Sequence, residues 1–257
     1  MTEKDDKSLD ILGIKPVATS IEKVTDGVVD AARAFLSRVC LPASEEFGLL
    51  LQDQIKSWRA SRAAILAKKA EEKVRIQYGD TDVTVLPRIA HAVFENGSWE
   101  DDETVHDMWA GLLASACSER GVDDSNLVFI ATLKQLSSLQ VRVLRFAVET
   151  ADKFVSRAGW PYAEHFECSA EKLREVCGTN DLIRIDREID HLTSLDLLGE
   201  GFDPDSEFLD LHPRPLAMSL YVRADGFPGT PIEYWNLKVK PEPEADKNAN
   251  KAEQSNA

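Results

Sequence analysis

The sequence predicts a mainly α-helical protein, with an N-terminal helical domain followed by a winged-helix-like C-terminal domain that contains a small β-hairpin. In many segments, apolar residues recur every three or four positions, which is the period of an α-helix. Further along, three short helical segments precede two extended ones, the element order of a winged helix-turn-helix. We therefore expect a helical domain over 11–136 and a winged-helix-like domain over 137–237. Residues 1–10 and 238–257 are polar, which predicts a flexible N-terminus and a disordered tail.

The first two predicted helices are long. One covers 21–40, and the second begins near Pro42, a residue suited to the first turn of a helix, and runs to about residue 77. Along the second helix, Phe47, Leu51 and Trp58 fall on one face, so we expect all three in the core. A short helix over 85–94 and a turn over 95–97 follow.

The segment DDETVHDMWAGLLASACSE, residues 101–119, raises the question of whether it is a reaction centre or a packed helix. Ser98, with Asp101 three residues later, resembles a helix cap, and acids suit the positive end of a helix dipole. Trp109, Leu112 and Leu113 lie on one apolar stripe and are predicted core residues, whereas His106 falls outside it. Consecutive acids on a helix point in different directions, so packing is favoured over a metal or acid-base site.

The C-terminal elements have local start signals. Residues 127–136 predict a buried helix, and Ser137 with Ser138 caps another that continues to about residue 155. Helices over 169–177 and 181–195 precede extended segments at 195–202 and 207–212. The four residues from Asp203 to Ser206 between them are typical of a hairpin loop. A last helix is expected to start near Pro215.

The charge distribution disfavours nucleic acid as a partner. The net charge is −15, and residues 139–226 contain ten Lys and Arg against seventeen Asp and Glu, which should repel phosphate. Arg184 and Arg187 on the expected recognition helix are outnumbered by neighbouring acids. A protein partner or a second copy of the chain is therefore favoured over DNA.

One segment opposes the overall charge. Residues 53–75 contain seven basic and three acidic residues, whereas residues 94–126 contain nine acids and Arg120 as their single base. We favour the interpretation that these are two solvated faces, over the alternative that they dock on each other or on a partner. If the basic helix makes contacts, Lys56, Arg59 and Arg62 are the predicted interaction residues, with Arg184 and Arg187 second.

No sequence motif supports catalysis or a cofactor. The nucleotide-binding, serine hydrolase and zinc protease motifs GxxxxGK[ST], GxGxxG, GxSxG and HExxH do not occur. Two loose sets of polar residues remain: His165 with Cys168, Cys177 and His191, and Asp205 with Asp210 and His212. The first matches no zinc spacing, and the second lacks the lysine of a nuclease pattern. We therefore expect no metal, no cofactor and no enzymatic activity.

The location predicted for the chain is the cytoplasm. Its four cysteines are far apart and form no CxxC pair, which is typical of reduced, buried thiols. The first residues are acidic where a signal peptide would be basic, and no apolar run is long enough for a membrane span.

Three blocks of sequence resemble a known bacterial family. LPASEEFGLLLQDQIKSWRA, then DETVHDMWAGLLASA, then FIATLKQLSSLQVRVL are similar, in this order, to blocks of the abortive-infection alpha family. The resemblance covers about residues 9–225 and implies an α-rich fold and a role in defence against phage. It implies no catalytic residue. Family members often begin their last helix with Thr-Pro-Leu-Gly, whereas this chain has HPRPL at 212–216.

The predicted function is therefore a non-enzymatic protein-interaction component of an abortive-infection response. A winged-helix transcriptional regulator is the alternative, and a metal-dependent nuclease effector is a weaker one.

Overall fold

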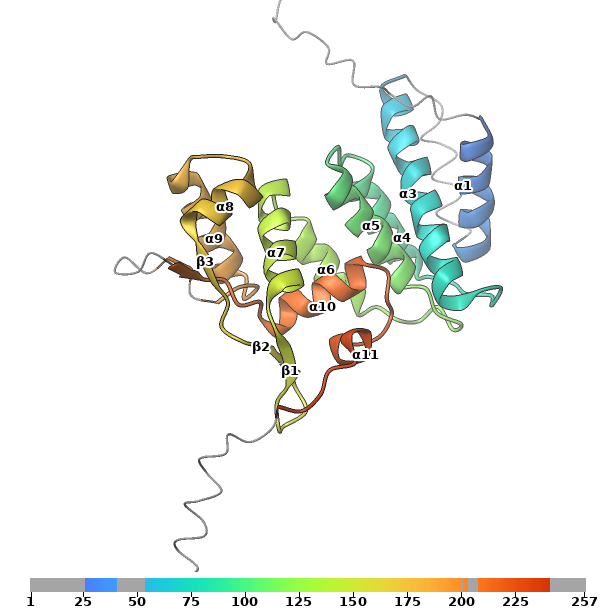
Figure 1. Cartoon of the computed structure of the whole chain (residues 1–257). Coiled ribbons are helices and arrows are strands. Elements are labelled where there is room, and N and C mark those ends of the chain that lie inside the picture. The colour runs from blue at the N-terminus through green and yellow to red at the C-terminus, as the bar shows by residue number, and fades with distance from the viewer. Residues whose placement is uncertain (1–25, 41–53, 200, 203–207, 241–257) are drawn as a thin grey trace, which may run out of the picture.

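A computed structural model describes residues 26–40, 54–199, 201–202 and 208–240, and it is mainly helical (Figure 1). The N-terminal part contains α1 (Asp26–Val39), α3 (Gln54–Tyr78), α4 (Pro87–Gly97), α5 (Glu103–Ser115) and α6 (Asn126–Leu133). Helix α5 lies at the centre, in contact with α3, α4 and α6, and α1 packs on α3. The predicted core residues Phe47 and Leu51 lie outside the described residues.

Helix α5 is buried on most of its surface. Trp109 is 3% exposed, and Leu112 and Leu113 are fully buried. Its N-cap is Asp102, whose carboxylate accepts hydrogen bonds from the backbone N–H groups of Thr104 and Val105. The prediction of a cap at Ser98 is therefore wrong. Helix α4 extends through Gly97, so residues 95–97 are helical and do not form the expected turn.

Trp58 does not join the core. It is 37% exposed, and its ring lies 6.4 Å from the ring of Trp99 at the surface. The stripe of apolar residues predicted its burial, but the adjacent face of α3 is the one that packs, through the alanines at 60, 63, 64, 67 and 70.

Helix α7 (Ser138–Thr150) begins with the predicted cap: Ser137 and Gln140 form a reciprocal capping box. The helix ends earlier than the expected residue 155. Instead, β1 (Lys153–Val155) pairs antiparallel with β2 (Pro161–Ala163). Pairing with a strand that lies several residues further on overrides the helical pattern there, and Gly159 adopts a positive φ between the two strands.

The next elements are β3 (Glu167–Ser169), α8 (Ala170–Cys177), α9 (Leu182–Ser194), β4 (Gly201–Phe202) and β5 (Phe208–Asp210). The three strands form an antiparallel sheet in the order β3-β5-β4. Helix α8 ends at Gly178 in a left-handed conformation, and α9 is capped by Asp181. The two helices and the β4-β5 pair agree with the sequence prediction, whereas the loop at 203–207 lies outside the described residues.

The chain finishes with α10 (Pro215–Ala224) and α11 (Pro231–Trp235). Helix α10 starts at the predicted proline and packs on both α5 and α7 (Figure 1). The buried Arg223 bonds to Asn126, Asp123 and Ser125 at the start of α6. One apolar core therefore continues from the N-terminal helices into the C-terminal part.

Candidate functional site

Helix α9 presents one face to solvent. Its buried face consists of Ile185, Ile189 and Leu192, which recur at helical spacing. On the other face, Ile183 is 83% exposed, and Arg184 and Arg187 are exposed beside it. Asp181 and Asp190 are also exposed, so an isolated apolar side chain lies on a surface of mixed charge.

Two other predicted interaction residues, Arg59 and Arg62, make contacts within the chain. The side chain of Arg59 is 14% exposed and donates to Ser98 Oγ at 3.0 Å and to Glu95 at 3.3 Å. The side chain of Arg62 is 12% exposed, donates to the Glu100 carbonyl at 2.8 Å, and pairs with Glu103. Lys56 belongs to α3, but its side chain is outside the described part of the structure.

The basic and acidic segments therefore dock on each other, contrary to the favoured interpretation of two solvated faces. Lys69 bonds to Glu103 at 3.1 Å, and Lys73 pairs with Asp107 at 3.2 Å. The hydrogen bond from Arg62, assisted by Lys69, lowers the pKa of Glu103 to about 2 although burial opposes this. The charges match because α3 and α5 pack side by side.

These contacts also separate the acids of the 101–119 segment. Asp102 caps the helix, while Glu103 and Asp107 face the basic side chains of α3. Among the described carboxylates of this segment, each of these three is therefore used in a contact within the chain.

His106 is fully buried, although the sequence placed it outside the packed stripe. Its Nε2–H donates to the Arg62 carbonyl at 3.0 Å, while Nδ1 has no hydrogen-bond partner among the described residues. Burial, followed by the nearby Arg62 guanidinium, lowers the pKa of His106 to about 4. The prediction from a single apolar stripe is wrong here because other helices cover α5 on several sides. Helix α3 covers the side that contains His106.

An open groove of about 530 Å³ lies beside α5 and α7. It is lined by Glu103, Thr104, Asp107, Arg142, Arg145, Phe146, Glu149 and Val176. Arg145 bonds to Glu149 at 2.8 Å, and Arg142 pairs with Asp102 at 3.7 Å. Both arginines thus already pair with acids, and the lining does not favour a ligand of one charge.

The loose zinc set from the sequence does not assemble. Cys168 and Cys177 are free and buried in the core, where burial raises the pKa of both thiols, to about 11 for Cys177. His191 Nδ1 is hydrogen bonded to the Gln140 amide at 2.8 Å. Only His165 of that set takes part in a cluster of possible ligands in the described residues.

That cluster consists of His165, Asp210 and His212. From the sequence, His165 belonged to one set of polar residues, and Asp210 and His212 belonged to the other. Glu167 pairs with Asp210 in the β3–β5 register, and Leu211 N donates to the Phe166 carbonyl at 2.9 Å. Continuing this register places His165 opposite His212. Because residues two apart in a strand share a face, Asp210 lies on the same side as His212.

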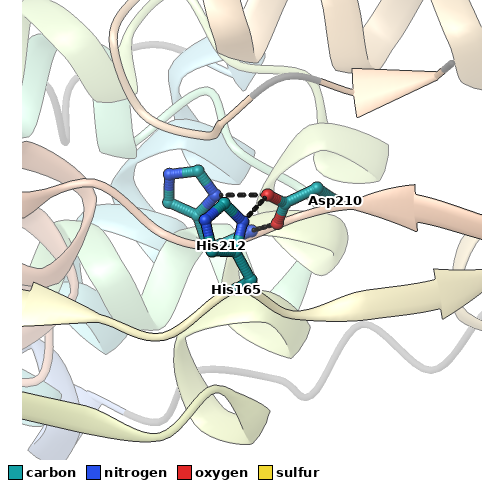
Figure 2. Close-up of side chains that lie close together, drawn as sticks. All are labelled: His165, Asp210 and His212. Carbon is teal, nitrogen blue, oxygen red and sulfur yellow. Dashed lines mark hydrogen bonds and ion pairs between the residues drawn. The ribbon is translucent and has the colours of Figure 1, made fainter. Parts of the chain in front are cut away.

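Figure 2 shows the Asp210 carboxylate directed at both imidazole rings. Its Oδ2 contacts Nδ1 of His212 at 2.9 Å and also Nδ1 of His165. Its Oδ1 accepts from the backbone N–H groups of His212 and Phe166. Although burial opposes it, these hydrogen bonds lower the pKa of Asp210. The two rings are 5.1 Å apart, centroid to centroid.

Sequence reasoning missed this cluster and the exposed position of Ile183. The cluster forms because the segment around His165 pairs with the second strand of the hairpin. The sequence does not show which strand that segment pairs with, so no pattern of residues indicated the cluster.

None of the helices among the described residues combines the length and the apolar character needed to cross a membrane.

Comparison with known proteins supplies the family. No curated protein and no solved structure matches the chain. The family model described as "Abortive infection alpha" matches residues 59–218, which is more than half of the 257 residues. The match covers most of α3, helix α5, the β3-β5-β4 sheet and α9, and it includes the second and third sequence blocks but only the last two residues of the first. It confirms the family: the chain belongs to the abortive infection alpha family.

Proposed function

We propose that the protein acts in abortive infection, a bacterial response to phage, as a non-enzymatic component that binds a protein partner through the exposed face of α9. Membership of the abortive infection alpha family supports the defence role. The observation that carries the choice of surface is Ile183, an isoleucine that is 83% exposed on a helix whose other apolar residues are buried.

The arrangement around α9 supports a winged-helix interpretation. After α7 and the separate β1-β2 pair, the elements follow in the order β3, α8, α9, β4 and β5, and β3 joins the hairpin through β5. In this arrangement α9 occupies the place of the recognition helix, the element that winged helices present to their partners. The partner therefore meets the face that contains Ile183, Arg184 and Arg187.

The composition of this face favours a protein partner over DNA. A DNA-reading helix begins with attraction to phosphate, whereas the two arginines here are accompanied by the exposed Asp181 and Asp190. Burial of an exposed isoleucine against another protein contributes favourable free energy, at about 25 cal/mol per Å² of apolar area removed from water. Arginines beside it are suited to the rim of such an interface.

The test is a phage challenge of cells that express the wild-type chain, the Ile183→Asp variant or an empty vector. Ile76→Asp is a matched control, because Ile76 is 78% exposed on α3, away from this face. Both variants should keep the wild-type thermal stability. We expect the wild type and Ile76→Asp to reduce plaque counts and Ile183→Asp to lose this protection.

Two results would contradict the proposal. Equal plaque counts for wild-type and vector cells across diverse phages would remove the defence role, and full protection by Ile183→Asp would remove this surface. The regulator alternative predicts that the purified protein shifts specific duplex DNA, and that Arg184→Glu with Arg187→Glu abolishes the shift.

A further inference from the structure

The cluster of His165, Asp210 and His212 lies at the end of the small sheet where β3 begins and β5 ends (Figure 2). From the geometry of this cluster, we infer that these three side chains form a binding site for a divalent transition-metal ion of the zinc class. The site would connect the β3 and β5 segments at the base of the β4-β5 hairpin. It does not depend on the proposed function.

The donor set has the right chemistry. Imidazole nitrogen and carboxylate oxygen are both zinc ligands, and three protein ligands with one open position are a common coordination set. In this cluster one ligand atom from each residue lies within 4.8 Å of the other two, and Nδ1 of both histidines contacts the Asp210 carboxylate.

The spacing suits an ion of this size. Metal–ligand distances of about 2.0 to 2.2 Å in a tetrahedral site place neighbouring ligand atoms about 3.2 to 3.6 Å apart. The Asp210 Oδ2 to His212 Nδ1 distance is 2.9 Å, so these ligands need only separate by a few tenths of an ångström. Both Nδ1 atoms already point at one carboxylate oxygen, so the three side chains hold their ligand atoms close together, as a metal site requires.

Two of the three ligands are held in place. Asp210 Oδ1 is fixed by two backbone N–H groups, which leaves Oδ2 directed at the rings. A Cβ atom added to Gly199 would lie 2.1 Å from Cε1 of His212, so the glycine is what allows the ring to lie there. Preorganised ligands of this kind reduce the ordering cost of binding.

The third ligand is open to solvent. The side chain of His165 is 83% exposed, compared with 18% for Asp210 and 23% for His212. An ion can therefore enter from the His165 side, and the fourth position faces water. On binding, Nδ1 of each imidazole gives up to solvent the proton that it donates to Asp210, and the neutral ring then carries its proton on Nε2 and offers the Nδ1 lone pair, so two hydrogen bonds to Asp210 are exchanged for metal–ligand bonds.

Cobalt(II) is a suitable probe, because its visible spectrum reports coordination geometry and a near-ultraviolet band reports thiolate ligands. The full chain, first treated with chelator, is titrated with Co²⁺ by absorption and with Zn²⁺ by calorimetry. We expect one ion per chain, visible bands of a four- or five-coordinate site, and no thiolate band, since Cys168 and Cys177 are buried apart from the cluster.

The variants identify the ligands. His165→Ala should leave the fold unchanged, because the side chain is exposed, and should weaken binding by at least about tenfold, since even loss of outer-shell partners costs about 10- to 100-fold. His212→Ala and the isosteric Asp210→Asn should do the same, with folding checked by circular dichroism. His91→Ala, at an exposed histidine of α4, is the matched control and should bind like the wild type.

Three outcomes would overturn the inference. These are no saturable binding of either ion, binding that is unaffected in folded His165→Ala and His212→Ala variants, and a thiolate band that assigns the ion to cysteine. Because binding is measured on purified protein, failure here leaves the phage assay and its interpretation unaffected.

Discussion

His106 should make the stability of the protein depend on pH between about 6.5 and 4.5. The folded state holds this histidine neutral, with its pKa lowered from 6.5 to about 4 by burial and by the Arg62 guanidinium. The unfolded chain gains the proton first as pH falls. Above about pH 7 this group therefore has no effect on the free energy of unfolding. The free energy of unfolding decreases as the pH falls from about 6.5 to 4.5.

The magnitude follows from the size of the shift. Each pH unit between the two pKa values corresponds to about 1.4 kcal/mol, so the His106 contribution amounts to about 2 to 3 kcal/mol between pH 7 and pH 4.5. That is a large part of a typical net stability of about 5 to 15 kcal/mol. We end the range at pH 4.5 because Glu103 adds a second effect below it. The unfolded chain protonates this carboxylate near its ordinary pKa of 4.5, whereas the folded state holds the pKa at about 2, so further stability is lost at lower pH.

The assay is urea unfolding at half-unit steps from pH 7.5 to 4.5 for the wild type and for His106→Gln, which keeps an N–H donor but does not titrate in this range. The wild type should lose about 2 to 3 kcal/mol more than the variant over the series. His91→Gln is the control for removing an exposed histidine and should follow the wild type. Parallel curves for the wild type and His106→Gln would refute the reasoning about burial.

Three further predictions concern packing. Trp109→Ala should cost about 3 to 5 kcal/mol of unfolding free energy, whereas Trp58→Ala should cost much less because Trp58 is 37% exposed; equal losses in urea unfolding would contradict this. Gly111→Ala should destabilise by about 1 to 3 kcal/mol or more, since its Cβ would lie 1.7 Å from the Ala224 carbonyl oxygen, and a wild-type thermal midpoint would contradict it. All four cysteines are buried, so a thiol reagent should modify them only at the rate of unfolding, and fast labelling of the native protein would count against their burial.

Local signals account for the elements that the sequence predicted well. Ser137 and Gln140 form their capping box within four residues, Gly178 ends α8, and Pro215 begins α10. Each of these depends on hydrogen bonds or dihedral angles within one turn of chain, which neighbouring residues determine. The family resemblance belongs here too, because its motifs are the packing residues of such helices.

Tertiary contacts decided the rest. The end of α7 was overestimated because β1 pairs with β2, and His106 was misplaced because α3 covers that side of α5. Arg59 and Arg62, which were expected to meet a partner, pair instead with acids that lie 36 and 41 residues away along the chain.

By itself, then, the sequence determined the helical class, most helix starts and the family, since these reside in short-range periodicity and capping. Only the tertiary structure decided which charged and polar groups are buried, paired or exposed. The register between β3 and β5 brings His165 to Asp210 across 45 residues, and the packing of α9 leaves Ile183 in solvent. Such juxtapositions depend on which surfaces meet in three dimensions, and the spacing of residues along the chain does not specify that.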